Sequence, residues 1–233
     1  MQPGSQHTVK AFDEDLNQLR ALISQMGGLA EHAIRESMRC LVHRDREGAL
    51  KVVADDKKLD ALETEAENRI LQLIALRAPM ADDLREAVAA LKIVGVVERI
   101  GDYAKNIAKR VPQLDGASSI EPLSLLPEMA RITAEMVHDV LDAFVERDGD
   151  KARAVCERDQ AVDDFYNSIF RALLTFMMED PHSITQSAHL LFVAKNLERI
   201  GDHATNVAEM VYFAATGDRL GERQKGLDPA TAQ

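Results

Sequence analysis

The residues Glu98-Arg-Ile-Gly-Asp102 return unchanged as Glu198-Arg-Ile-Gly-Asp202. The identity continues along both copies at Ala104/Ala204, Asn106/Asn206 and Ala108/Ala208. Nearer the amino terminus, further matches occur at a slightly longer spacing, at Met26/Met129, Asp45/Asp148, Ala49/Ala152, Val52/Val155, Asp56/Asp159 and Asp60/Asp163. A pattern repeated in the same order over most of the chain predicts an internal duplication into two tandem units.

Six long segments around these matches have apolar residues spaced by three and four, which is typical of α-helices. We expect helices at about 9–44, 47–77, 81–110, 123–147, 151–178 and 184–216. Helices this long are stable when they pack along their sides, as in bundles. The predicted fold is therefore all-α, with two tandem antiparallel three-helix bundles. The first repeat spans 8–111 and the second 121–216, with a linker at 112–122 and a flexible polar tail at 217–233.

The composition fits this architecture and excludes several classes of protein. Only 10 of the 233 residues are aromatic and 46% are hydrophobic, which favours helices and a sizeable core. A net charge of −11, from 28 Lys+Arg and 39 Asp+Glu, argues against a nucleic-acid-binding protein. No apolar run is long enough to insert into a membrane, and two cysteines suit a reducing compartment. We expect a cytoplasmic protein.

The repeated motif carries acidic side chains at helical spacing. On a helical wheel the apolar residues of the third segment share one face, and Glu98, Asp102 and Asn106 lie opposite them. Glu198, Asp202 and Asn206 have the same outward placement in the sixth segment. Two further acidic pairs, Asp56/Asp60 and Asp159/Asp163, lie on the preceding helix of each repeat. In the second segment Glu63 and Glu67 extend this row, whereas Tyr166 and Phe170 take the corresponding places in the fifth.

Rows of like charges on a helix are destabilising unless a cation lies between them. Carboxylate and amide oxygens are hard ligands that suit magnesium, manganese, calcium or iron. One helix supplies only part of a coordination shell, so water or the neighbouring acidic pairs would complete it. The alternative is that both rows are solvated surface charges. Gly101 and Gly201 lie inside the helices at the edge of the core, where a missing side chain lets two helices approach closely.

Two copies of Glu-Arg-Ile-Gly-Asp-x-x-x-Asn, each closing a three-helix half, resemble the PhoU family of phosphate-signalling regulators. Supporting stretches are Gln25-Met-Gly-Gly28, His138-Asp-Val-Leu-Asp-Ala-Phe144 and Met177-Met-Glu-Asp180. The resemblance implies metal clusters on the outer surface, held by Glu98, Asp102 and Asn106 and by Glu198, Asp202 and Asn206. It matches the family's other acidic motif to Asp56/Asp60 and Asp159/Asp163. Iron, zinc, magnesium and manganese all remain open as the bound metal.

The resemblance also implies a function without catalysis. Such proteins connect a phosphate ABC transporter ATPase with a membrane sensor histidine kinase, and they repress the phosphate-starvation response when phosphate is plentiful. The protein would then be a cytoplasmic homodimer, peripheral at the inner membrane through its partners. The alternative is a metal-dependent enzyme or a metal-storage helical bundle.

Overall fold

The structure is a computed structural model that describes residues 3–114 and 124–220, with side chains from Phe12 onward. Its elements are α1 (Pro3–His43), α2 (Arg46–Arg77), α3 (Asp82–Ala108), the short 3-10 helix η1 (Val111–Leu114), α4 (Leu126–Glu146), α5 (Gly149–Glu179), the 3-10 helix η3 (Pro181–Ser183) and α6 (Ile184–Thr216). The predicted all-α fold with six long helices is confirmed. The first helix begins earlier than the predicted residue 9, and η1 occupies the start of the predicted linker. The rest of that linker, 115–122, and most of the predicted tail, 221–233, lie outside the described residues.

The two halves use the same turn between their first and second helices. Arg44 and Arg147 end the first helix with φ of 54° and 56°. The next residue, Asp45 or Asp148, caps the following helix, because its carboxylate accepts backbone N–H groups of the first turn. The Asp45 carboxylate accepts the N–H of Gly48 at 2.9 Å. The duplication therefore extends to local capping.

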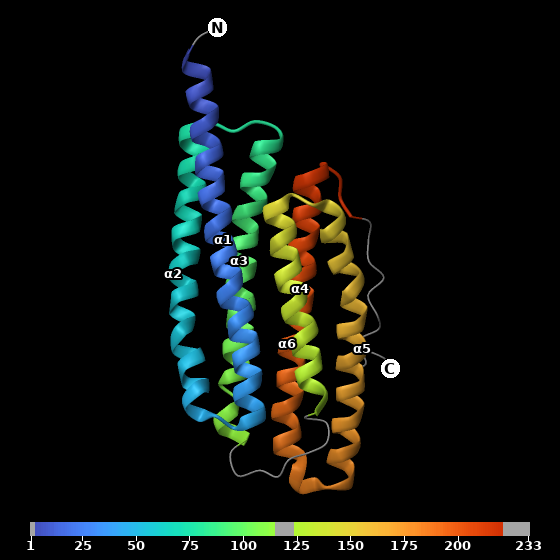
Figure 1. The fold of residues 1–233 in the computed structure, drawn as a ribbon. Helices are drawn as coiled ribbons and strands as arrows, with labels where there is room; N and C mark the ends of the chain where they lie inside the picture. Colours follow the sequence, from blue (N-terminus) through green and yellow to red (C-terminus); the bar gives the residue numbers. More distant parts are fainter. Residues whose placement is uncertain (1–2, 115–123, 221–233) are drawn as a thin grey trace.

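The helices of each half pack side by side, and the two halves pack against each other through α1 with α4 and α3 with α6. In Figure 1, α3 runs away from the end at which the chain begins, whereas α6 runs toward it. The buried apolar side chains of both halves form one cluster, which includes Ile23 and Ile93 as well as Met129 and Ile200. The two three-helix bundles thus share one core.

Gly101 and Gly201 lie where the third helix of each half touches the second. A Cβ built on Gly101 would lie 2.2 Å from Leu59 Cδ2, and one on Gly201 would lie 3.2 Å from Val162 Cγ1. The predicted role of both glycines in close helix approach is confirmed.

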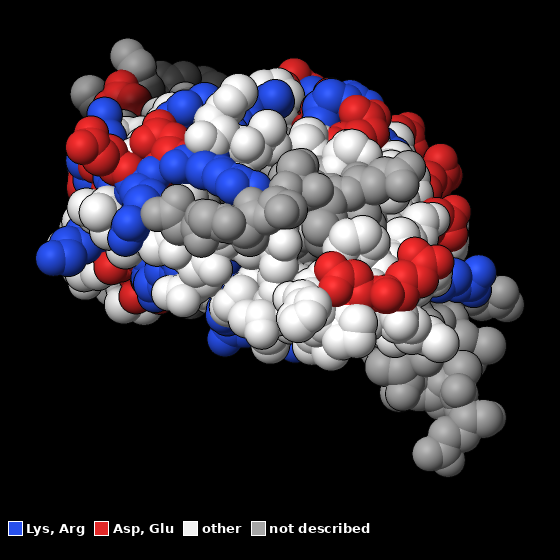
Figure 2. Space-filling model, turned by 90° about the horizontal axis from the view of Figure 1, so that it is seen from below, with Lys and Arg blue, Asp and Glu red and all other residues white. Residues whose placement is uncertain are grey.

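No helix within the described ranges is long and apolar enough to cross a membrane. Seen along the bundle axis, Lys and Arg form a band on one side of the face, and Asp and Glu form a row on the other side with further groups at the edges (Figure 2). The net negative charge is therefore spread unevenly over this end of the molecule.

Candidate metal centres

The acidic side chains of α2 and α3 lie together along the contact between these helices. Asp56 Oδ1 lies 3.8 Å from the place of a Cβ on Gly101, and Glu63 Oε1 lies 3.7 Å from that of Gly95. The row on α2 therefore runs alongside α3 in the opposite direction. We call Asp56, Asp60, Glu63, Glu98 and Asp102 the first acidic cluster.

The predicted outward orientation of these side chains is wrong in part. Glu98 and Asp102 are half-buried, and the Asp56 side chain is only 8% exposed. A helical wheel assigns one core face to each helix, whereas α3 contacts α1, α2 and α6 and so has covered flanks as well. Glu98 and Asp102 lie on the flank of α3 that α2 covers, and with Asp56 they line a crevice between the two helices, whereas Asp60 is exposed.

Crowding of carboxylates in this crevice changes the proton affinity of Glu98. Burial, followed by the negative charges of Asp102, Glu63, Asp60 and Asp56, raises the pKa of Glu98 to about 7. Burial, followed by the negative charges of Glu67, Asp60 and Asp102, also raises the pKa of Glu63. Both shifts mean that the cluster has too little positive charge around it to stabilise all its carboxylates in the ionised form.

One end of the first acidic cluster is neutralised by Lys105. Its ammonium donates hydrogen bonds to Asp56 Oδ2 and Asp102 Oδ1, both at 2.5 Å. Burial disfavours the charge of this ammonium, but the two hydrogen bonds outweigh that cost and raise the pKa of Lys105. A lysine thus binds two of the predicted metal ligands.

The second half has a related cluster with a different counter-ion. We call Asp159, Asp163, Glu198 and Asp202 the second acidic cluster. Asp159 is 9% exposed, with its Oδ1 3.4 Å from the place of a Cβ on Gly201. Lys195 donates a hydrogen bond to Glu198 Oε1 at 2.8 Å.

Burial and the nearby Asp202 and Asp163 raise the pKa of Glu198, and Lys195 opposes them. The Lys195 ammonium also lies 5.0 Å from the centre of the Tyr166 ring. Tyr166 takes the place that Glu63 has in the first half. The second cluster is therefore poorer in acids and is paired with a cation at its opposite end.

Asn106 and Asn206 lie one helical turn beyond Asp102 and Asp202 and are half-buried. They share the helix faces of the two acidic clusters, as the spacing predicts. Asn106 therefore lies beyond the end of the first cluster that Lys105 occupies.

The chemistry of the two clusters fits a hard cation, because their donors are oxygen atoms with an excess of negative charge. Glu198 Oε2 is buried and has no hydrogen-bond partner within the described part of the chain, which leaves one oxygen available as a ligand. Across the same residues, however, no three His, Cys, Asp or Glu side chains converge on a common point where an ion would bind. The helices bring the predicted ligands together, and their side chains would have to rotate to enclose an ion.

The sequence pattern did not single out Lys105 and Lys195 as parts of these clusters. Each lies three residues from an acid of its own helix, at Asp102 and Glu198, and that spacing is a usable signal for a same-face contact. The contact of Lys105 with Asp56 depends on the relative height of α2 and α3, which spacing does not give.

Comparison with protein families gives two matches along this chain. A family model described as PhoU domain matches residues 23–111 and again residues 126–211. Both ranges fall inside the two predicted repeats.

Among curated proteins, the chain is 58% identical over 222 residues to the phosphate-specific transport system accessory protein PhoU homolog of Zymomonas mobilis, covering 95% of this chain and 94% of that protein. It is 48% identical over 225 residues to the protein of the same name from Caulobacter vibrioides, covering 96% and 98%. The similarity thus extends over nearly the whole of each protein.

Two crystal structures share this fold. PhoU from Pseudomonas aeruginosa is 34% identical with a TM-score of 0.85, covering 89% of this chain and 100% of that one. The phosphate transport system regulatory protein PhoU from Streptococcus pneumoniae is 26% identical with a TM-score of 0.84, covering 91% and 100%.

Proposed function

Because this chain belongs to the PhoU family, we propose that it is a non-enzymatic accessory protein that regulates phosphate uptake. The observation that carries this proposal is the 58% identity, over nearly the full length of both chains, to a protein named as an accessory of phosphate-specific transport. The likeness to a crystal structure named as a phosphate transport system regulatory protein supports the same role.

We further propose that the protein acts in the cytoplasm as an adaptor between the phosphate ABC transporter ATPase and a membrane sensor histidine kinase. In this role it represses the phosphate-starvation response when phosphate is plentiful. The long helices of the bundle offer extended, mixed-charge faces of the kind that dock on other proteins. A homodimer, peripheral at the inner membrane through its partners, is part of this proposal.

Metal ions belong to the proposal as structural components of the two acidic clusters. In the first half the ligands would come from Glu98, Asp102 and Asn106 of α3 with Asp56 and Asp60 of α2. In the second half they would come from Glu198, Asp202, Asn206, Asp159 and Asp163. Bound iron, zinc, magnesium or manganese would supply the positive charge that the raised pKa values of Glu98 and Glu198 indicate is lacking.

Deletion of the gene tests the regulatory role. In cells grown with abundant phosphate, we expect the deletion to raise expression of a phosphate-starvation reporter, and the parental chain supplied in trans to restore repression. The protein should also co-purify with the transporter ATPase or the kinase. An unchanged reporter in the deletion strain would contradict the proposal.

Elemental analysis of the purified protein tests the metal component. Asp102→Ala combined with Asp202→Ala is expected to lower the metal content of the chain. The matched control is Glu65→Ala combined with Glu157→Ala, two exposed acids on α2 and α5 outside both clusters. Equal metal content in the two double variants would remove the proposed sites.

A further inference from the structure

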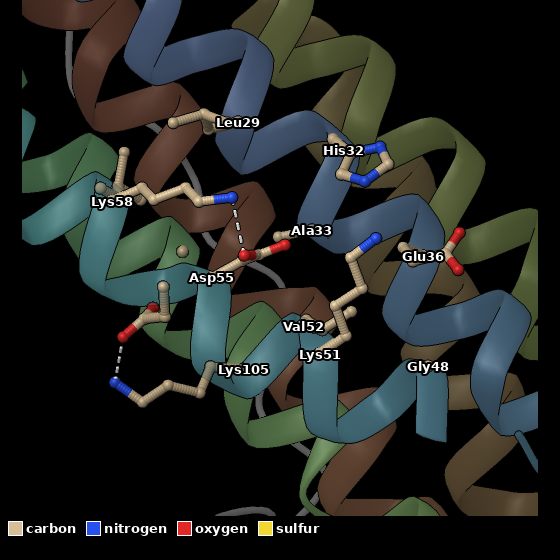
Figure 3. Close-up of a pocket in the computed structure, with 13 residues that line it drawn as sticks. Leu29, His32, Ala33, Glu36, Gly48, Lys51, Val52, Asp55, Lys58 and Lys105 are labelled. Carbon is tan, nitrogen blue, oxygen red and sulfur yellow. Dashed lines mark hydrogen bonds and ion pairs between the residues drawn. The ribbon is translucent and has the colours of Figure 1, made fainter. Parts of the chain in front are cut away.

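A cavity of about 210 Å³ opens between α1 and α2, next to the first acidic cluster. Its apolar wall includes Leu29 and Ala33 of α1 and Val52 of α2. Charged and polar side chains line the rest of it: His32 and Glu36 of α1, Lys51, Asp55, Asp56 and Lys58 of α2, and Lys105 of α3 (Figure 3). Cavities of about 150 Å³ already accommodate benzene, so this one has room for a ring with a charged substituent.

The positive charges around the cavity are not all neutralised. Lys58 forms an ion pair with Asp55 at 2.7 Å, and Lys105 is held by Asp56 and Asp102. No carboxylate of the described chain lies within ion-pairing distance of the Lys51 ammonium.

Basic side chains of α1 and α2 lie close enough to Asp55 to change its proton affinity. The Lys58 hydrogen bond, and then the positive charges of Lys51 and His32, keep the pKa of Asp55 below its usual range. Lys51 and His32 both line the cavity, so an ammonium without an ion-pair partner in the described chain and an imidazole face the same space.

An ion-pair network bridges the equivalent helices of the second half. Arg158, at the place that Asp55 has in the first half, donates hydrogen bonds to Asp139 and to Glu135, the latter at 2.9 Å. These contacts connect α5 to α4. In the first half His32 stands at the place of Glu135, and Asp55 pairs within its own helix.

The differences between the copies leave more space in the first groove and place an additional lysine there. Ala33 replaces the fully buried Met136, which removes side-chain volume, and Lys51 replaces Ala154, which adds a charge. Ligand pockets combine such an apolar wall with a few polar groups that fix orientation. The cavity thus has both components, and its second-half equivalent lacks the free cation.

We propose that the α1–α2 cavity binds a small organic anion, with its apolar body against Leu29, Ala33 and Val52 and its phosphate or carboxylate group at Lys51 and His32. The site adjoins the first acidic cluster, since Asp56 and Lys105 line the cavity as well, but the proposed anion contacts lie at Lys51 and His32. Binding at this site would let the protein respond to a metabolite. The proposal does not depend on which partner protein the bundle binds.

An NMR titration of the full ¹⁵N-labelled chain tests this proposal, with phenyl phosphate and phenylacetate as probes for the two anionic groups. We expect at least one probe to shift amide signals of α1 near Ala33 and of α2 near Lys51. Benzyl alcohol, which lacks the charge, should bind at least about tenfold more weakly, as expected for loss of a charged hydrogen bond. Inorganic phosphate, which lacks the ring, should also bind more weakly than phenyl phosphate.

Two substitutions taken from the second half separate shape from charge. Ala33→Met should fill the cavity and abolish binding without changing the net charge. Lys51→Ala should weaken binding of the anionic probe about tenfold and leave benzyl alcohol unaffected. The matched control is Lys57→Ala, an exposed lysine of the same helix outside the cavity, which should bind like the parent.

Failure of both probes to bind would overturn the proposal. So would parental affinity in both Ala33→Met and Lys51→Ala, or an equal loss of affinity in Lys57→Ala and Lys51→Ala. Should Ala33→Met fail to fold, as judged by circular dichroism, Lys51→Ala with its control decides the matter.

Discussion

The two halves of the molecule share one plan but balance their buried charges differently. In the first half five carboxylates lie between α2 and α3, and Lys105 neutralises the end at Asp56 and Asp102. In the second half Tyr166 stands in place of an acid, and Lys195 neutralises the end at Glu198. The capping aspartates and the mid-helix glycines are the same in both halves.

Comparison of the halves distinguishes residues that the fold uses in both copies from charged residues that differ between the copies. Positions that cap helices and allow close helix contacts are the same in both halves, as Asp45/Asp148 and Gly101/Gly201 show. Positions that set local charge have diverged. The two halves therefore provide internal controls for each other.

The largest expected effect comes from a buried glutamate that pairs with one arginine from each half and has no equivalent by duplication. Glu86 of α3, whose side chain is 3% exposed, pairs with Arg20 of α1 and lies 3.3 Å from Arg147 Nε at the end of α4. Gln186 stands at the corresponding place in α6. Arg20→Met should destabilise the protein by about 3 kcal/mol, because it removes the closer of the two arginines that pair with a buried carboxylate.

Urea unfolding of the Arg20→Met variant measures this effect. Arg35→Met, which removes an exposed pair with Glu31 on the same helix, serves as the control and should cost about 0.5 kcal/mol or less. Equal costs for the two variants would show that the Glu86 pair contributes no more than a surface pair.

A smaller effect is expected from filling the close helix contacts. Gly101→Ala should destabilise by about 2 kcal/mol, because the new methyl group overlaps the buried Leu59 side chain. Gly201→Ala should change stability by less than about 1 kcal/mol, because Val162 leaves more room and alanine favours the helix. Thermal unfolding of both variants checks the difference, and a larger loss at Gly201 would reverse the ranking of the two contacts.

The smallest effect concerns pH. The folded-state pKa of Glu98, about 7, lies above its ordinary value of 4.5, so the folded state binds the proton more tightly and loses stability as pH rises between these values. With metal removed by chelation, Glu98→Gln should therefore match the parent near pH 4 and exceed its stability near pH 8, by about 1 kcal/mol after solvent screening.

Glu198→Gln should gain less at pH 8, because Lys195 already compensates that carboxylate. The control is Glu65→Gln, at an exposed acid that pairs with Arg69 on the same helix. Melting temperatures at the two pH values measure all three differences. A gain for Glu98→Gln that did not depend on pH would contradict the explanation by charge crowding.

The sequence was sufficient to predict the helices, the duplication and the membership of the acidic clusters, since these depend on spacing along one helix. Glu98 and Asp102 share a face at any helix orientation, and the repeat identifies their partners. The six predicted helices differ from the observed ones mainly at their ends. Only the start of α1 lies far from its predicted position.

Features that depend on how helices lie against each other were beyond the sequence. The half-buried state of Glu98 follows from α2 covering one flank of α3, and the Lys105 contact with Asp56 follows from the height at which the two helices meet. The difference between the α1–α2 cavity and its equivalent in the second half also depends on a contact between helices, because Arg158 of α5 reaches across to α4. Such relations join residues far apart in the chain, and no periodicity records them.

The shared core has a consequence for the order in which this protein is made. Helix α3 packs against α6 as well as against α1 and α2, and Tyr103 stacks on His203 across that contact with ring centres 5.4 Å apart. On the ribosome, α3 is complete long before Ile184–Thr216 has been synthesised. The apolar flank that α6 later covers is exposed throughout that interval, so the nascent first half is a natural substrate for chaperones until the last helix arrives.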